Sequence, residues 1–335
     1  METLYILGVD ISKRTFQSAI TVDGTNFIEQ EVENTAKTIT AYFEEMKKKL
    51  VFSYSQLLVC LEHTGIYSYP LIDFLVQHQI KVCVEPALQI KRSQGMTRGK
   101  SDQVDARRIA QYAYKNRPEL KYWRPQRFVI KQLRALLATR ERLVKTRIQL
   151  ELPIDESADF IDESIRKMMA KNCKNTLKGL EKDLVRIEAE IDQIIRADAS
   201  LTEQMKWVTS VPGVGRITGL NVIIATGEFE KISEAKKFAC YAGVAPFEHS
   251  SGTSVRGKTR VSKMANMTLK KLLHLAARSA VLHCAELKAF YQRKIAEGKN
   301  KMSVLNAVRN KLISRIFACI KNKRLYEKDY FHALA

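Results

Sequence analysis

Three features that would place this 335-residue chain in familiar protein classes are missing. Its six cysteines are scattered without a C-x-x-C pair, which excludes a disulfide scaffold and fits a reducing cytoplasm. Its six histidines lack zinc-type spacing, so we expect no zinc site. No apolar run reaches membrane-spanning length and no signal peptide precedes the first strand, so we expect a cytoplasmic protein with no membrane partner.

Acidic residues are scarce in the last part of the chain. Residues 201–335 hold 24 Lys+Arg and 9 Asp+Glu, a net charge of +15 out of +20 for the whole chain. Residues 1–125 and 126–200 carry only +3 and +2. Concentrated positive charge favours polyanions through phosphate contacts and counterion release, so nucleic acid is the expected partner. A basic, solvated surface without a partner is the alternative.

Residues 1–120 are predicted to form an α/β domain. Three strands over 4–10, 15–22 and 27–33 follow one another across a tight Asp23-Gly24 turn, which is typical of an antiparallel meander. Helices and strands then alternate, with helices expected at 38–50, 67–78, 86–92 and 101–116 and strands at 56–61 and 80–84. This order is that of a ribonuclease-H-like domain.

Residues 126–200 are predicted to be helical. A helix over 127–150 contains no Gly or Pro, and Pro153 is expected to interrupt it. Apolar residues then recur at steps of three and four, which indicates a heptad seam: Leu177, Leu180, Leu184, Ile187, Ile191 and Ile194. The seam can pack on the earlier helix or on another protomer. We favour an antiparallel coiled-coil hairpin that also helps oligomerisation.

Residues 201–335 are predicted to be mainly helical. The turn Ser210–Gly215 resembles the hairpin of a helix-hairpin-helix element, in which Gly213 and Gly215 let backbone N–H groups approach a phosphate. An ordinary helix–helix turn is the alternative. A loop is expected over 248–263 and helices over 267–283, 285–297 and 303–321. Basic residues lie on or after the last helix: Arg309, Lys311, Arg315, Lys321, Lys323 and Arg324.

Four carboxylates stand where predicted elements begin or end. Asp10 and Glu62 each end an apolar strand, and Asp102 and Asp105 open a helix three residues apart, so that they share one face. Carboxylates at strand ends and a helix start can converge on a hard cation such as Mg²⁺, which prefers oxygen ligands and commonly acts on phosphates. Alternatively, the helical pair caps its helix and the other two are ordinary loop-facing acids.

A second group of residues places hydroxyls among cations. Ser251, Thr253 and Ser254 lie close in sequence to the basic residues Arg256, Lys258, Arg260 and Lys263. A hydroxyl in this setting can attack a phosphodiester while the cations offset charge on the phosphoryl oxygens. The same residues can simply bind DNA phosphates, and composition alone favours that interpretation.

Taken together, these residues resemble the DEDD transposases of the IS110 insertion-sequence family, which also includes Piv-type DNA invertases. The similarity runs in order over nearly the whole chain. The matching stretches are Gly8-Val9-Asp10 with Lys13, Glu62 to Gly65, Pro86-Ala87, Lys100 to Arg107, Pro212 to Gly215, Phe238 to Pro246 and Ser251 to Lys258.

The resemblance implies a RuvC-like N-terminal domain, a coiled-coil middle and a C-terminal transposase domain. It assigns Asp10, Glu62, Asp102 and Asp105 to Mg²⁺ and the nucleophile to Ser251, with Thr253 and Ser254 as neighbours left open. Members act as tetramers in which different protomers complete one site. At least some are guided by an element-encoded structured RNA that pairs with donor and target DNA, and exchange passes through a covalent phosphoserine.

The chain is therefore expected to be a Mg²⁺-dependent serine recombinase of an insertion sequence, in which Arg256 and Lys258 neutralise charge at the scissile phosphate. One alternative is a RuvC-like Holliday-junction endonuclease, in which metal-activated water attacks and Ser251 only contacts phosphate. The other is a non-enzymatic nucleic-acid-binding assembly protein.

Overall fold

The computed structural model describes residues 4–62, 64–93, 102–156, 159–251, 255–261 and 265–327, the side chains of 247–251 and 255–260 excepted. The chain divides into two compact units, Met1–Pro125 and Gln126–Ala335, and each is described by itself. The finer boundary expected at residue 201 stays a prediction. Within these residues, none of the helices is both long and apolar enough to cross a bilayer.

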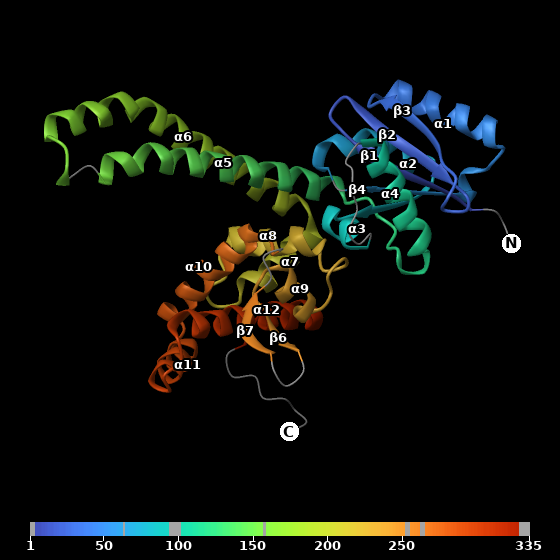
Figure 1. Ribbon diagram of the computed structural model, residues 1–335. Helices are drawn as coiled ribbons and strands as arrows, with labels where there is room; N and C mark the ends of the chain where they lie inside the picture. Colours follow the sequence, from blue (N-terminus) through green and yellow to red (C-terminus); the bar gives the residue numbers. More distant parts are fainter. Residues whose placement is uncertain are drawn as a thin grey trace. The chain divides into compact units, whose positions relative to one another are not determined.

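Unit 1 is built on a mixed five-stranded sheet of order β3-β2-β1-β4-β5 (Figure 1). β1 (Tyr5–Ile11), β2 (Thr15–Thr21) and β3 (Ile28–Glu33) form the expected antiparallel meander, while β4 (Leu57–Glu62) and β5 (Lys81–Glu85) run parallel to β1. The helices are α1 (Ala36–Leu50), α2 (Tyr69–Gln77), α3 (Ala87–Ser93) and α4 (Asp102–Lys115), with 3₁₀ turns at Tyr54–Gln56, Gly65–Ser68 and Arg117–Glu119.

The two faces of this sheet pack on different helices because strand side chains alternate between faces. One face packs on α1 and α2 through Leu7, Val9, Val59 and Leu61. The other face packs on α4, where Ile6, Leu58, Cys60 and Cys83 meet Ile109, Tyr112 and Ala113. This alternation decides which way the residues at the strand ends face.

Unit 2 begins with two long helices, α5 (Phe128–Glu156) and α6 (Glu163–Ala197), that lie side by side (Figure 1). Leu184 and Ile191 of the predicted seam are buried, and α5 and α6 pack on each other within one chain, as expected of a helical hairpin. Its coiled-coil geometry stays a prediction. Its role in oligomerisation stays a prediction. The expected break at Pro153 is wrong, because α5 continues to Glu156. Pro153 lies in the last turn of α5, where it removes a single backbone hydrogen bond shortly before the helix ends.

The rest of unit 2 is a cluster of helices: α7 (Ala199–Thr209), α8 (Arg216–Thr226), α9 (Ala235–Tyr241), α10 (Met267–His283), α11 (Ala285–Ala296) and α12 (Lys301–Asn322). Their buried core includes Ile130 and Leu133 of α5 and Ile191 and Ile195 of α6. The base of the α5–α6 hairpin therefore shares one apolar core with the C-terminal helices.

The prediction of a loop over 248–263 is wrong for the residues of this segment that the structure describes. β6 (Pro246–Ser251) and β7 (Val255–Val261) pair there as an antiparallel hairpin with a register shift between Phe247 and His249. The basic and glycine residues of this segment suggested a loop. However, Val255, Thr259 and Val261 are β-branched residues at alternating positions, which favours a strand.

Candidate functional site

Asp10 and Glu62 lie on neighbouring strands at the same end of the unit 1 sheet. β1 and β4 run parallel, and their register pairs Val9 with Leu61, the residues directly before the two carboxylates. Neighbouring strands are about 4.8 Å apart, so the two backbone positions are adjacent. Both residues are half-buried.

The alternation of the strands places both carboxylates on the α4 side of the sheet. Asp10 follows Gly8 by two residues, and Glu62 follows Cys60 by two. Gly8 lies directly against α4, since a Cβ there would be 2.3 Å from the carbonyl oxygen of Ala106. Cys60 belongs to the cluster that packs on α4. Residues two apart on a strand share a face, so Asp10 and Glu62 face the same way.

The direction of α4 brings its first turn to the same end of the sheet. Tyr114, near the C-terminus of α4, packs where Gly24 follows β2, and Thr21 of β2 pairs with Ile6 at the start of β1. Ala106 packs further along β1, against Gly8. α4 therefore runs against the direction of β1, and Asp102 and Asp105 lie toward the end that holds Asp10 and Glu62.

The four carboxylates share one end of unit 1 without being gathered around a point. In the described part of the chain, no three His, Cys, Asp or Glu side chains lie close enough to hold a metal ion. Asp105 accepts a hydrogen bond from Arg108 at 2.9 Å, and Asp102 is exposed. The oxygen donors and their common position suit Mg²⁺. A metal site formed by Asp10, Glu62, Asp102 and Asp105 stays a prediction.

A fifth carboxylate, Glu85, was missed by the sequence reasoning. It ends β5, pairs in register with Glu62 and follows Cys83, which faces α4, by two residues. Its side chain is only 8% exposed. Burial, together with the nearby Glu85 charge, raises the pKa of Tyr112 on α4. The signal was present in the sequence, because Glu85 is another acid at the end of an apolar strand, but the predicted strand stopped at residue 84.

The cysteines behind this acidic end are inert packing residues. Cys60 and Cys83 are fully buried, as expected for small core side chains. Burial raises the pKa of the Cys83 thiol to about 12 and raises that of Cys60 as well. Both thiols therefore stay protonated at neutral pH and do not compete as metal ligands.

The hairpin of unit 2 fixes the backbone positions around the candidate nucleophile. Ser251 ends β6 and pairs with Val255, while the preceding Ser250 pairs with Arg256. Arg256, Lys258 and Arg260 occupy alternate positions of β7. Thr253, Ser254 and Lys263 lie outside the described residues. The catalytic and phosphate-binding roles of all these residues stay predictions.

The two glycines of the Ser210–Gly215 turn have different surroundings. Gly213 has φ +84°, and a Cβ there would lie 2.5 Å from the carbonyl oxygen of Ala276 on α10, so this glycine permits close packing. Gly215 precedes α8 and has open space where a Cβ would be. It borders an open groove of about 410 Å³ whose basic lining residues are Arg196, Lys206 and Arg216. A phosphate contact here stays a prediction.

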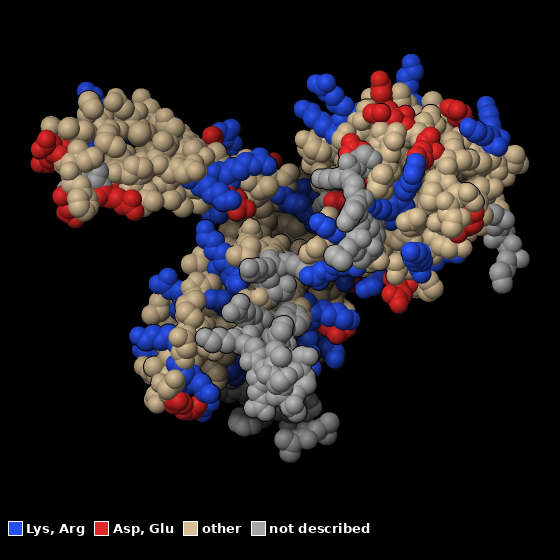
Figure 2. All heavy atoms as spheres, viewed as in Figure 1, with Lys and Arg blue, Asp and Glu red and all other residues tan. Residues whose placement is uncertain are grey.

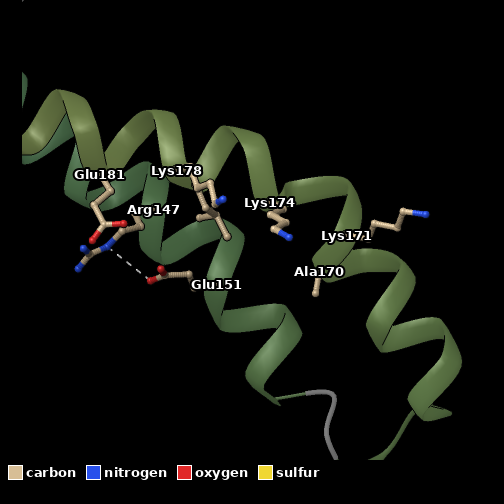
Figure 3. A pocket seen from close by; sticks show the side chains of 8 residues that line it. Arg147, Glu151, Ala170, Lys171, Lys174, Lys178 and Glu181 are labelled. Atoms are coloured by element: carbon tan, nitrogen blue, oxygen red, sulfur yellow. Dashed lines mark ion pairs between the residues drawn. The ribbon is translucent and has the colours of Figure 1, made fainter.

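A second basic groove was missed by the sequence reasoning. It lies between α5 and α6, has a volume of about 500 Å³ and presents Lys171, Lys174 and Lys178 of α6 (Figure 3). Arg147 of α5 pairs with Glu151 at 3.5 Å on the opposite side. Lysines at steps of three and four were the available signal.

Charge is unevenly distributed within unit 2. Blue spheres outnumber red ones over the C-terminal helices in Figure 2, in keeping with the net charge of +15 for residues 201–335. Red spheres gather at the far end of the α5–α6 hairpin. The acidic residues of that end are Glu151, Asp155, Glu156, Asp159, Asp162 and Glu163.

Comparisons with known proteins agree with the residue pattern. A family model for the DEDD transposases of IS110 matches residues 7–157, and the model described as Transposase IS116/IS110/IS902 family matches residues 205–292. The pilin gene-inverting protein of Moraxella bovis is 26% identical over 340 residues, covering 98% of this chain and 99% of that protein. The transposase for insertion sequence element IS1111A of Coxiella burnetii is 25% identical over 254 residues, covering 68% of each chain.

Among solved structures, the Thermus thermophilus RuvC in complex with a Holliday junction substrate aligns with 36% of this chain and 99% of its own. The identity is 13% and the TM-score 0.28. The two family models match in succession along one chain that also aligns over nearly its whole length with the pilin gene-inverting protein. This protein belongs to the IS110 family of transposases, enzymes of DNA transposition and recombination.

Proposed function

We propose that this transposase cleaves and exchanges DNA strands with Mg²⁺ bound by its unit 1 carboxylates and with Ser251 as the nucleophile. The observation that carries the proposal is the placement of Asp10 and Glu62 on adjacent strand ends that face α4, whose first turn holds Asp102 and Asp105. Glu85, in register with Glu62, adds negative charge to the same edge. The basic hairpin of unit 2 supplies the hydroxyl and the cations.

In this proposal each residue has a defined role. Mg²⁺, when bound, neutralises charge on the scissile phosphate. The Ser251 Oγ attacks phosphorus and a Ser–O–P bond forms, while the bond from phosphorus to the departing strand oxygen breaks. The proton of the Ser251 hydroxyl is transferred to that departing oxygen. Arg256 and Lys258 offset the negative charge that grows on the phosphoryl oxygens. Attack by a hydroxyl of the incoming strand then reverses the step, releases Ser251 and joins the new strands.

Replacing the nucleophile tests this proposal against the junction-endonuclease alternative. Ser251→Ala should abolish strand cleavage and the denaturation-resistant protein–DNA adduct, because no other step in the mechanism forms that bond. Ser250→Ala is the matched control on the neighbouring residue and should retain both. Cleavage by the Ser251→Ala variant without any adduct would instead indicate metal-activated water as the nucleophile.

Replacing a strand-end carboxylate tests the non-enzymatic alternative. Asp10→Asn keeps the shape of the side chain and removes its charge, so cleavage should fall by on the order of 10³-fold with DNA binding retained. Cleavage is measured on a labelled duplex carrying the element ends, with Mg²⁺ titrated. A variant that cleaves as well as the wild type at every Mg²⁺ concentration would exclude the metal role of Asp10.

The RNA guide and the tetramer are also part of the proposal, on the strength of the family resemblance. Exposed apolar side chains along the hairpin support self-association: Ile148, Leu152, Ile161, Ile165 and Met168. Mixing Asp10→Asn with Ser251→Ala protein should restore activity if different protomers complete one site.

Purification from cells that carry the flanking element DNA, followed by sequencing of bound RNA, tests the guide. If no structured RNA is recovered, the proposal of an RNA guide is wrong, whereas the proposed recombinase activity is unaffected.

A further inference from the structure

Among the residues that the structure describes in unit 2, Arg309 is a buried arginine without a carboxylate partner. Arg309 of α12 is 5% exposed, and its Nε has no hydrogen-bond partner. Its two other contacts are neutral: it donates to Nδ1 of His274 at 2.6 Å and to Oδ1 of Asn306 at 3.4 Å. Arg309 forms no ion pair with any residue in the part of the chain that the structure covers. Burying an arginine unpaired is costly, so such a cation needs an explanation.

The same helix shows how this fold treats an arginine with a structural role. Arg315, six residues further along α12, pairs with Glu286 at 2.5 Å and stacks over the Tyr326 ring at 4.9 Å. Burial lowers the pKa of Arg309, and no carboxylate counters that effect. Arg309 therefore lacks the counter-ion that Arg315 has, and an anion from outside the chain would supply it.

The surroundings of Arg309 match a phosphate group. His274 accepts from Arg309 through Nδ1, so its neutral ring carries the proton on Nε2 and can donate a hydrogen bond. Burial and the charges of Arg309 and Arg278 lower the pKa of His274, which keeps the ring neutral at pH 7. His274 is only partly buried and thus connects the buried guanidinium with the surface. Lys270 and Arg278 lie one turn to either side of it on α10.

The cluster lies at the base of the β6–β7 hairpin. Asn306 donates to the carbonyl oxygen of Val244, two residues before β6, at 2.7 Å. Ser251 ends that strand, seven residues after Val244 and so at most roughly 24 Å from it along an extended chain. A phosphate at Arg309 would therefore lie within about seven nucleotides of one at Ser251, since B-form DNA rises 3.4 Å per base.

We propose that Arg309 and His274 bind one phosphate of the DNA backbone, with Lys270 and Arg278 contacting neighbouring phosphates. The identification of the phosphate as part of DNA rests on the proposed function. The site itself rests on the buried cation and its neighbours. Nothing in the proposed cleavage chemistry requires these residues, so their contribution is to DNA affinity and register.

Thermal unfolding of the full-length protein with and without inorganic phosphate, at constant ionic strength, tests the site. Wild-type protein should melt a few degrees higher with phosphate, because only the folded state binds it. Arg309→Met should raise the melting temperature of the free protein by removing an unpaired buried charge, and should abolish the phosphate response. Arg315→Met is the matched control, which should melt lower and keep that response. A lower melting temperature for Arg309→Met, or an unchanged phosphate response, would overturn the site.

DNA binding tests the identity of the ligand. Arg309→Met should weaken binding to a labelled duplex about tenfold and reduce the salt dependence by about one phosphate contact, while Arg315→Met changes neither. Loss of the phosphate response without any loss of DNA affinity, or a loss confined to RNA, would overturn the assignment to DNA. If the wild type cleaved no DNA at all, the proposed function would fail, whereas the phosphate and affinity measurements would still decide the site.

Discussion

Each unit brings a helix against a glycine close to its candidate site, but the two glycines serve different purposes. In unit 1, Gly8 of β1 lies two residues before Asp10 and touches α4, the helix that begins with Asp102 and Asp105. In unit 2, Gly213 touches α10, while the open position that could admit a phosphate belongs to Gly215. In unit 1, the contact of Gly8 with α4 therefore both packs the sheet and positions the candidate metal ligands. In unit 2, Gly213 serves packing and Gly215 is the candidate phosphate contact.

This difference bears on how each unit can tolerate change. In unit 1, any shift of α4 away from β1 also moves two of the four carboxylates, so stability and activity should fall together. In unit 2, the candidate nucleophile and the cations Arg256, Lys258 and Arg260 stand on a two-stranded hairpin, away from the glycine contact with α10, so the packing of that turn and the cleavage chemistry should respond to separate substitutions.

Gly8→Ala is expected to have the largest effect on stability. The new Cβ would lie 2.3 Å from backbone atoms of Ala106 and Ala110, which cannot move without displacing α4. Overpacking of this kind costs about 3 kcal/mol, and calorimetry should show an early transition of unit 1. Strand cleavage should be lost while duplex binding by unit 2 persists. Gly179→Ala, at an open site on α6, is the control and should stabilise by about 0.5–1 kcal/mol. Full cleavage by a stable Gly8→Ala protein would contradict the proposal that stability and activity both depend on the packing of α4 against β1.

The glycine pair of unit 2 should show separate effects. Gly213→Ala places a Cβ 2.5 Å from the Ala276 carbonyl at φ +84°, so it should destabilise by about 2 kcal/mol. Gly215→Ala has open space and should cost less than about 1 kcal/mol, as a poorer residue at the helix cap. DNA affinity at low temperature should fall for Gly215→Ala if its backbone contacts phosphate. Equal affinity for the two variants would indicate an ordinary turn.

Features that depend on local patterns, such as the limits of the strands in unit 1, could be predicted from the sequence. All five strands of unit 1 lie within two residues of their predicted ends, because apolar runs and turn residues are local signals. The positions of Asp10 and Glu62 followed from the same signals. The β6–β7 hairpin was missed because basic and glycine residues outweighed its alternating β-branched positions. The contrast between Gly213 and Gly215 and the burial of Arg309 depend on contacts with α10, which no local pattern reveals.

The smallest predicted effect concerns whether the α5–α6 hairpin belongs to the folding unit of the C-terminal helices. Asp198 caps α7 by accepting from the Leu201 N–H at 2.9 Å and pairs with Arg127, near the start of α5, at 2.7 Å. Hydrogen bonding to Arg127, then to the backbone, lowers the pKa of Asp198. Arg127 also pairs with Glu228, after α8, so one guanidinium joins three parts of unit 2.

Asp198→Asn keeps a good capping residue and removes the charge, so it should lower the free energy of unfolding at pH 7 by about 0.5–1 kcal/mol. Because the folded pKa lies below the unfolded one, the contribution of the charge is present above the unfolded value near 4 and is lost as pH falls through the folded value. Urea unfolding at pH 7 and at successively lower pH should show the gap between wild type and variant closing. A gap that stays constant would mean that the charge on Asp198 does not help to hold α5 to the C-terminal helices.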